Sequence, residues 1–266
     1  MNFDEIVLLT YIGSLSVLMF FASHGFIMIF YQHKYGRNIP KEKEEEVLNK
    51  TVTIQLPLFN EMYVADRLIN AVCKIDFPKD QLEIQVLDDS IDETYDVVAK
   101  IVKEKQKLGF DIKHLHRVDR KGFKAGALKE GMKTAKGEFI AIFDADFIPS
   151  SDFLKSTLKF FSDDNVGMVQ TRWEHLNEDY SMLTKIQALA LDGHFVIEQT
   201  VRNRAGFFIN FNGTGGVWRK SCIVDAGDWH DDTITEDLDL SYRAQLKGWK
   251  FIYSAILPHQ QNYRQR

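Results

Sequence analysis

Acidic side chains follow short apolar runs of this 266-residue chain at three places. Residues 57–61 (PLFNE), 88–92 (DDSID) and 144–146 (DAD) each end such a run. Carboxylates held close together repel one another and raise one another's pKa values, so a shared site needs a compensating cation. Hard divalent ions such as Mg²⁺ and Mn²⁺ prefer oxygen ligands. If the runs are neighbouring strands, the pattern predicts a metal site where they end.

Asp144 and Asp146 are the best candidates for the metal ligands. Side chains two residues apart in an extended segment face the same side, and Ala145 leaves room between them. An isolated Asp-x-Asp is more often a turn that caps a helix, here the one expected after Pro149. The apolar residues FIAIF directly before the pair, together with the other two acidic segments, favour the metal site.

A basic segment could bind the substrate phosphates that such a metal commonly also binds. Metals held by few carboxylates usually also bind substrate phosphates. Residues 117–128 (RVDRKGFKAGAL) carry basic side chains, Lys124 among them, before the small residues Ala125, Gly126 and Ala127. Small residues let a diphosphate approach a helix N-terminus. A solvated surface loop is the alternative, and neither a P-loop motif nor a dinucleotide-binding glycine motif is present.

Short β-rich runs alternate with segments of helical length in the part of the chain that carries these residues. The runs cover residues 51–57, 83–89, 111–116 and 138–146, and the helical segments cover 65–74, 94–107 and 125–135. This alternation indicates an α/β fold with a doubly wound, mainly parallel sheet. Ligands of such sheets bind beyond the carboxyl ends of the strands, where the acidic segments lie.

The second half of the chain carries three further patterns. Residues 180–201 have the apolar spacing of a long amphipathic helix. Residues 211–219 (FNGTGGVWR) contain too much glycine for an ordinary strand and suit the close approach of a ligand. Residues 235–239 (TEDLD) open a further helix, and acids there also match the helix dipole.

The N-terminal segment predicts a transmembrane helix. Residues 6–30 contain no Asp, Glu, Lys or Arg and exceed the ~20 residues that span a bilayer. A signal peptide would begin with basic residues, whereas Asp4 and Glu5 stand here. A buried helix of a soluble protein is the alternative. Basic residues follow the segment on its later side only, so the positive-inside rule places the rest of the chain in the cytoplasm.

These patterns divide the chain into a transmembrane helix (1–32), a charged cytoplasmic linker (33–50) and a catalytic domain (51–266). The net charge of −5 removes the main reason to expect nucleic acid as a partner, because phosphate backbones bind basic surfaces. Two widely separated cysteines indicate neither a disulfide framework nor a zinc site, which fits a reducing compartment.

Motifs in both halves resemble those of the family-two membrane glycosyltransferases, the cellulose synthase-like enzymes. The likeness is strongest to plant mannan synthases and xyloglucan-backbone glucan synthases. In chain order the motifs are LPLFNE, VLDDSIDET, FKAGAL, IFDADF, VQTRW, FNGTGGVWR and TEDLDLSYRAQLKGWK. The resemblance implies an A-type nucleotide-sugar transferase fold and inverting transfer of a hexose, from UDP-glucose or GDP-mannose, to a growing β-linked polysaccharide.

The resemblance also implies roles for single residues. Asp237 is the general base, and helical spacing turns its neighbours Glu236 and Asp239 away from it. Mg²⁺ or Mn²⁺ binds at Asp144 and Asp146. The nucleotide sugar contacts Pro57, Asn60, Glu61, Asp89, Lys124, Gly126 and Asp144, and the acceptor contacts Asn212, Gly213, Thr214, Trp218, Gln261 and Arg264.

The C-terminal end departs from the family pattern. Family members continue with Gln-x-x-Arg-Trp and further membrane helices, whereas Gln265 follows Arg264 here and the sequence ends at Arg266. The expectation is therefore a fragment, an aberrant gene product or a chain that a partner completes. Two other functions stay open, a transferase that adds one sugar to a membrane lipid and an inactive membrane-anchored module that binds a nucleotide sugar.

Overall fold

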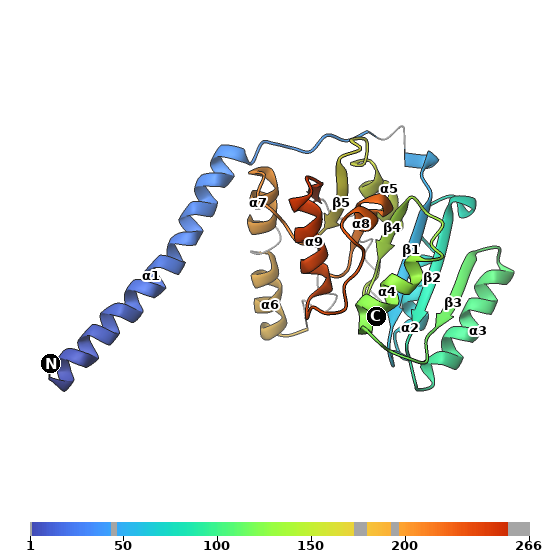
Figure 1. The fold of residues 1–266 in the computed structure, drawn as a ribbon, viewed down its shortest axis with the longest axis horizontal. Helices are drawn as coiled ribbons and strands as arrows, with labels where there is room; N and C mark the ends of the chain where they lie inside the picture. Colours follow the sequence, from blue (N-terminus) through green and yellow to red (C-terminus); the bar gives the residue numbers. More distant parts are fainter. Residues whose placement is uncertain (1, 44–46, 173–179, 193–196, 255–266) are drawn as a thin grey trace. The chain divides into compact units, whose positions relative to one another are not determined.

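The computed structural model describes residues 2–43, 47–172, 180–192 and 197–254 (Figure 1). The chain forms two compact units, made of residues 1–39 with 177–207 and of residues 40–176 with 208–266. The smaller unit contains the N-terminal helix, and the larger unit contains the segments in which the sequence predicts chemistry.

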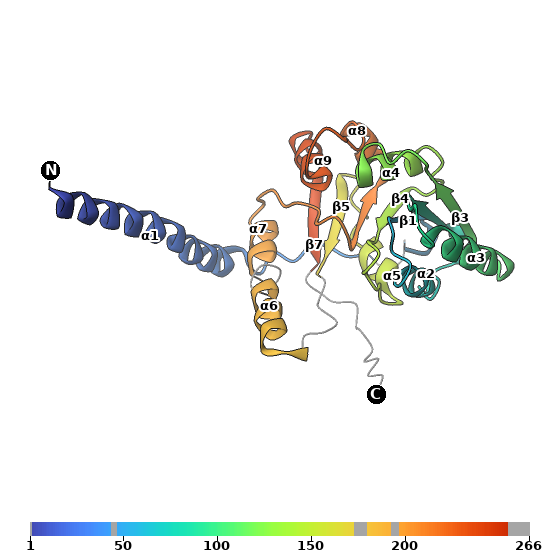
Figure 2. The same cartoon turned by 90° about the horizontal axis from the view of Figure 1, so that it is seen from below.

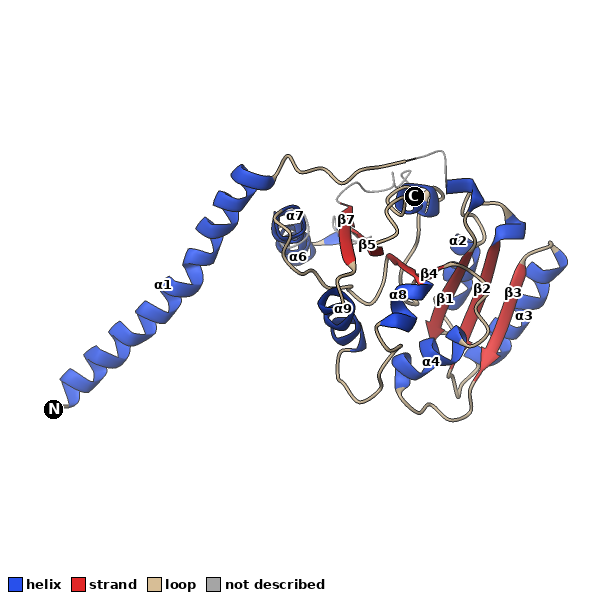
Figure 3. Ribbon diagram, turned by 45° about the horizontal axis from the view of Figure 1, so that its top comes forward, coloured by secondary structure: helices blue, strands red, loops and turns tan. Residues whose placement is uncertain are grey.

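The larger unit is organised around a seven-stranded sheet (Figures 1 and 3). Its strands are β1 (Val52–Leu58), β2 (Leu82–Asp88), β3 (Asp111–His116), β4 (Phe139–Ile142), β5 (Val166–Thr171), β6 (Gly216–Arg219) and β7 (Lys250–Ser254). Their order across the sheet is β3-β2-β1-β4-β6-β5-β7. β3, β2, β1 and β4 are parallel, β6 is antiparallel to both neighbours, and β7 is parallel to β5. The predicted α/β fold with a mainly parallel sheet is confirmed.

Helices cover both faces of this sheet (Figure 2). They are α2 (Ala65–Val72), α3 (Thr94–Lys107), α4 (Phe123–Met132), α5 (Phe153–Leu158), α8 (Lys220–Asp225) and α9 (Glu236–Leu246), with 3-10 turns at Val47–Asn49 and Lys79–Gln81. In Figure 2, α2, α3 and α5 lie on one face, and α4, α8 and α9 lie on the other. The chain winds from β1 outward to β3 and returns through α4 to β4, so strand order reverses between β1 and β4. A ligand crevice is expected at that point.

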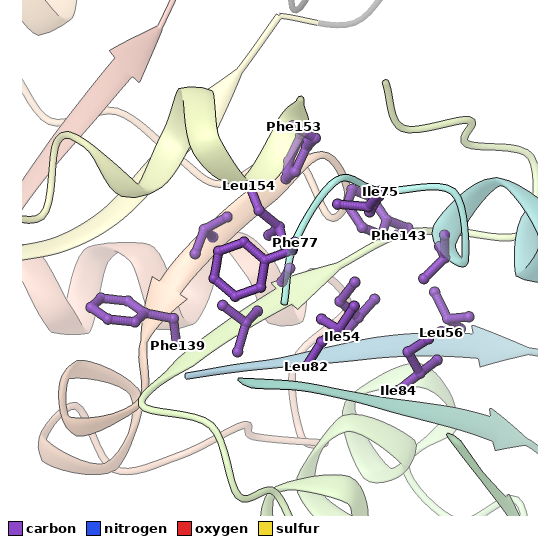
Figure 4. Packing of buried hydrophobic residues seen from close by; sticks show 14 of the residues in the cluster. Ile54, Leu56, Ile75, Phe77, Leu82, Ile84, Phe139, Phe143, Phe153 and Leu154 are labelled. Carbon is purple, nitrogen blue, oxygen red and sulfur yellow. The ribbon is translucent and has the colours of Figure 1, made fainter. Parts of the chain in front are cut away.

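Apolar side chains between the sheet and α5 anchor the strands that lead to this crevice (Figure 4). Ile54 and Leu56 of β1 are fully buried, and the ring of Phe143, just after β4, lies 4.8 Å from that of Phe153 in α5. Full burial of such a side chain contributes roughly 1.5–3 kcal/mol to the free energy of unfolding. The acidic strand ends therefore project from a rigid support.

Two expectations about single segments are wrong. Residues 216–219 form β6, a fully buried strand between β4 and β5, although their segment is rich in glycine. A Cβ on Gly216 would lie 2.7 Å from the ring of Phe211, so packing alone requires glycine there. The predicted linker 33–50 is not wholly a connector, because Val47 is buried in the core of the larger unit.

The smaller unit contains α1 (Phe3–Tyr35), α6 (Met182–Asp192) and α7 (Thr200–Arg204). α1 is long and apolar enough to cross a membrane, and it continues past the predicted boundary at residue 32. The C-terminal end of α1 contacts α7 and the residues just after it. The ring of Phe207 lies 5.0 Å from that of Tyr31, and Arg204 Nη1 donates to the carbonyl of Gly36 at 3.4 Å. Both α6 and the start of α7 fall within the predicted helix, while residues 193–196 lie outside the described residues.

Candidate active site

A bidentate ion pair lies where β2 and β3 end. Asp89 follows β2 and is buried, and Arg117 follows β3. Arg117 Nε lies 2.7 Å from Asp89 Oδ1, and Nη2 lies 2.5 Å from Oδ2. Arg117 also donates to the carbonyls of Lys121 at 3.2 Å and Phe123 at 3.0 Å. The predicted basic segment is therefore held against the sheet edge and is not a free surface loop.

Asn60 connects the ends of β1 and β2. Its backbone φ of 56° lies in the left-handed region, which asparagine tolerates better than most residues. The Asn60 N–H donates to Ser90 Oγ at 2.9 Å, and Asn60 Oδ1 accepts from the N–H of Ile91 at 3.1 Å. Pro57 lies inside β1, and Glu61 is exposed just before α2. Asn60 thus fixes the position of one predicted nucleotide-binding segment against the other.

Lys124 joins three segments that are distant in the sequence. It lies in the first turn of α4, after Gly122 with its φ of 72°. Its Nζ pairs with Asp144 Oδ1 and donates to the carbonyl of Gly213 at 3.0 Å. The N–H of Asp144 donates to Thr214 Oγ1 at 3.0 Å. The end of β4, the start of α4 and the glycine-rich segment therefore meet at one point.

Asp237 reaches the same point from the start of α9. A Cβ built on Gly213 would lie 3.3 Å from Asp237 Oδ2 and 3.3 Å from Lys124 Nζ. The φ of Gly213 is 75°, so a larger residue would be strained as well as crowded. Asp237 Oδ1 accepts a hydrogen bond from the N–H of Leu238 at 2.8 Å. The structure thus brings together Lys124, Asp144, Gly213 and Asp237, which the sequence analysis assigned to binding the nucleotide sugar, the metal and the acceptor and to acting as the base.

Acidic groups outnumber basic ones around this point. Burial raises the pKa of Asp144, and the charges of Asp146 and Asp237 raise it further, while Lys124 opposes the change. Burial also raises the pKa of Glu236, which feels the charges of Lys124, Asp237 and Asp144. The expectation that Glu236 points away from Asp237 stays a prediction.

Asp239, the other neighbour of Asp237, has a separate structural partner. Asp239 forms an ion pair with Arg243. Its Oδ2 accepts hydrogen bonds from Arg243 Nε at 2.9 Å and from Nη2 at 2.6 Å. Arg243 also donates to the carbonyl of Asp228 at 2.9 Å. Asp239 therefore ties α9 to the loop before it, and its carboxylate is occupied there.

The residues at the end of β4 fit a divalent cation. Asp144 and Asp146 offer carboxylate oxygens, the donors that Mg²⁺ and Mn²⁺ prefer. Asp146 is exposed, and the pKa of Asp144 is raised chiefly by burial and further by the negative charge of Asp146 and Asp237, while Lys124 opposes the change. A cation at this pair would compensate that charge.

Gly126 has a packing role in α4. A Cβ there would lie 2.1 Å from the carbonyl of Lys121 and 2.8 Å from Arg117 Nη1. Glycine is thus needed where the basic segment folds back on the helix, which is a reason independent of any diphosphate. The contact keeps the Arg117 guanidinium close to the first turn of α4.

The predicted acceptor residues occupy different environments. Asn212 donates its N–H to Gln170 Oε1 at 3.0 Å, close to Gly213. Trp218 is fully buried in β6, with its ring 5.7 Å from Phe211 and 5.2 Å from Phe251. Its ring belongs to the core and does not reach the surface of the site. Gln261 and Arg264 lie outside the described residues.

Sequence reasoning missed the partners of two strand-end acids. The pairing of Asp89 with Arg117 joins residues from separate loops and has no local signal. Asp88 lies with His114 and His116 in a group whose ligand atoms are all within 4.8 Å of one another. A signal for this second group does exist, because His-x-His in a strand places both imidazoles on one face.

The sheet order and the acidic strand ends define the class of protein, an A-type nucleotide-sugar transferase fold. Among solved structures, a mannosyltransferase of Pyrobaculum calidifontis, PcManGT, in complex with GDP-Man and Mn²⁺ matches with a TM-score of 0.72 and 19% identity, over 94% of this chain and 70% of that one. S. aureus TarS 1-349 in complex with UDP-GlcNAc matches with a TM-score of 0.57 and 18% identity, over 77% of this chain and 56% of that one. At these identities the likeness concerns the fold.

Residues 49–258 match the family described as Glycosyltransferase like family 2, and the chain belongs to this family. Glucomannan 4-beta-mannosyltransferase 1 of Oryza sativa subsp. japonica is 47% identical over 76% of the chain. Glucomannan 4-beta-mannosyltransferase 9 of Arabidopsis thaliana is 45% identical over 77%. The chain covers 40% of the length of each of these two relatives.

Proposed function

We propose that this chain is the catalytic part of a membrane-anchored inverting glycosyltransferase that moves mannose from GDP-mannose to a growing β-linked mannan. The observation that carries the proposal is the meeting of Lys124, Asp144 and Asp237 around Gly213. The names of the plant relatives, glucomannan 4-beta-mannosyltransferases, support mannose as the sugar. The complex of PcManGT with GDP-Man supports the same donor, with UDP-glucose as the alternative.

The donor binds along the ends of β2 and β4. Asp89, held by Arg117, lies where the nucleoside would rest in a sheet of this order. Lys124 provides the positive charge for the diphosphate. Asp144 and Asp146 would hold Mg²⁺ or Mn²⁺, which neutralises charge on the leaving diphosphate when bound.

The transfer is a single displacement. The acceptor hydroxyl oxygen forms a bond to the anomeric carbon of the sugar, and the bond from that carbon to the diphosphate oxygen breaks. Asp237 takes the hydroxyl proton as general base. One carboxylate base suffices, whereas hydrolysis of a glycosidic bond uses a pair of carboxyl groups that flank the bond.

The acceptor sugar lies against the segment from Asn212 to Thr214. Asn212 Nδ2 is buried and has no hydrogen-bond partner within the part of the chain that the structure describes. A buried donor without a partner is costly, so it favours a ligand that supplies an acceptor oxygen. A sugar hydroxyl next to Asp237 would do so.

α1 anchors the protein in the membrane, with the N-terminus outside and the larger unit in the cytoplasm. The length and apolar composition of α1 support the anchor, and the basic residues after it support the orientation. A reporter fused after Arg266 should therefore be cytoplasmic. An extracytoplasmic reporter would reverse the topology.

The donor is tested by calorimetry of the full chain in detergent with Mn²⁺, comparing GDP-mannose, UDP-glucose and the two nucleoside diphosphates. We expect the tightest binding for GDP-mannose. Preference for UDP-glucose would change the sugar, and binding of neither donor would overturn the proposal.

The reaction is tested with a fusion of the chain to the part of the rice relative that follows the matched region. Release of GDP with a β-mannan oligosaccharide acceptor supports transfer, and long products support a polymerising enzyme. A single added sugar on a lipid acceptor would favour the lipid-modifying alternative. Donor binding without release of GDP would favour the inactive binding module.

A further inference from the structure

Three side chains on one face of the sheet converge at the ends of β2 and β3. In the parallel register of these strands, Asp88 is paired with His116, and Val86 is paired with His114. Paired residues share a face, and so do residues two apart in a strand. Asp88, His114 and His116 therefore project from the same face, next to the Asp89–Arg117 ion pair but separate from the Asp144–Asp146 pair.

One carboxylate oxygen of Asp88 faces both imidazoles. His114 Nε2 lies 2.7 Å from Asp88 Oδ2, and His116 Nδ1 lies 3.5 Å from the same oxygen. The second distance is too long for a good hydrogen bond. Asp88 is fully buried, so it cannot rely on water to satisfy its charge. A cation among the three atoms would bind all of them at once.

We propose that Asp88, His114 and His116 form a binding site for a transition-metal ion of the Zn²⁺ class. Two imidazole nitrogens and one carboxylate oxygen are a ligand set that suits zinc, with the fourth position open to water. The side chains of His114 and His116 are 12% and 28% exposed, which gives an ion access from solvent. Imidazole ligands also set the site apart from the all-carboxylate pair at the end of β4, which suits Mg²⁺ or Mn²⁺.

The surroundings hold the three ligands in place. Asp88 Oδ1, the oxygen that does not face the imidazoles, accepts a hydrogen bond from the N–H of Ser90 at 2.8 Å. The ring of Tyr95 lies 5.0 Å from the His114 ring and 4.7 Å from the His116 ring. A hydrogen bond to a carboxylate ligand orients that ligand toward the metal. The ring contacts with Tyr95 restrict the orientation of the two imidazoles.

The ion would stabilise the wall of the nucleotide pocket. Asp88 precedes Asp89 and His116 precedes Arg117, so the ion would join the two strands directly behind the ion pair that holds the basic segment. A ligand that binds the folded state alone raises the free energy of unfolding. Zinc should therefore raise the melting temperature of the chain. It would be a different ion from the Mg²⁺ or Mn²⁺ that binds the diphosphate of the donor.

The test is a titration of the metal-free full chain in detergent with Co²⁺, in the presence of excess Mg²⁺. Four-coordinate Co²⁺ with imidazole ligands gives visible absorption bands. We expect one such Co²⁺ per wild-type chain, displaced by Zn²⁺, and binding at least ~10-fold weaker for His114→Gln and for His116→Gln. His230→Gln, which changes an exposed histidine near Asp239, and Asp146→Asn should both keep the signal.

A second measurement separates loss of the ion from loss of the fold. His116→Gln should melt within about a degree of the wild type without metal, and Zn²⁺ should raise the melting temperature of the wild type only. The proposal is overturned if the wild type shows no tetrahedral Co²⁺ bands, if both histidine variants keep them, or if Asp146→Asn removes them. An equal Zn²⁺ shift for His116→Gln and wild type would also overturn it.

Discussion

The carboxylates on the two sides of Gly213 differ in whether they form ion pairs. On the side of β2 and β4, Asp89 is paired with Arg117 and Asp144 with Lys124. On the side of α9, the Asp237 carboxylate is in no ion pair among the described residues and accepts a hydrogen bond from the N–H of Leu238. A carboxylate paired with a cation is held in position by that partner. In the proposed reaction the first side holds the charged donor, and the second provides the base.

The largest effect should come from the reactive side. Asp237→Asn keeps the shape of the side chain but cannot accept the acceptor proton, so turnover of the fusion described above should fall at least ~10²-fold. Donor affinity should stay nearly unchanged. The control is Asp239→Asn, which removes the negative charge paired with Arg243 and should lower stability more than turnover. Normal turnover in Asp237→Asn together with its loss in Asp239→Asn would show that the base is misassigned.

The next largest effect should come from Lys124. Lys124→Met removes the only cation paired with Asp144 in the described chain and leaves the carboxylates around it uncompensated. Donor affinity should fall at least ~10-fold, in line with ~1.5–3 kcal/mol for a hydrogen bond to a charged group. Lys129→Met, an exposed position of the same helix, should change little. Calorimetry that finds equal losses for both variants would remove Lys124 from the site.

A matched pair of glycines separates backbone strain from crowding. Gly213 and Gly109 both have positive φ, at 75° and 83°, so an alanine at either should cost roughly 1 kcal/mol of stability. A Cβ at Gly109 meets nothing within 4 Å, whereas one at Gly213 meets Asp237 and Lys124. Only Gly213→Ala should therefore also weaken donor binding, by several-fold. Unchanged donor binding in a folded Gly213→Ala chain would mean that the site tolerates a methyl group there.

The last of these predictions concerns the two thiols, which lie outside the site. Burial raises the pKa of Cys73 to about 11 and that of Cys222 to about 12. The thiolate is the reactive form, and two pKa units reduce its fraction near pH 8 by about 100-fold. Alkylation of the folded chain by iodoacetamide, followed by mass spectrometry, should be much slower than in urea, and slowest at Cys222. Equal rates in the folded and unfolded chain would contradict the raised pKa values of the half-buried Cys73 and the buried Cys222.

The first half of the fold was predictable because its signals are local. Apolar runs such as FIAIF end in acids, and alternating helices favour parallel strands, so the edge of the sheet at which the acidic strand ends lie follows from the sequence. β6 could not be predicted, because its position between β4 and β5 depends on residues far away in the chain. The meeting of Asp237 with Lys124 around Gly213 has the same origin, since packing and not local sequence sets how α9 faces β4.

The division between a ligand-holding side and a reactive side is tested most directly by one calorimetric comparison. GDP-mannose is titrated into the wild-type chain, Asp146→Asn and Asp237→Asn, each with Mn²⁺ and with a chelator. If Asp146 holds the cation shared with the diphosphate, Asp146→Asn should weaken binding at least ~10-fold with Mn²⁺ and have little effect without it. Asp237→Asn should bind within about 2-fold of the wild type in both conditions, as expected of a base that acts in the transition state. Equal affinity of wild type and Asp146→Asn with Mn²⁺, or a loss of binding in Asp237→Asn alone, would contradict the account.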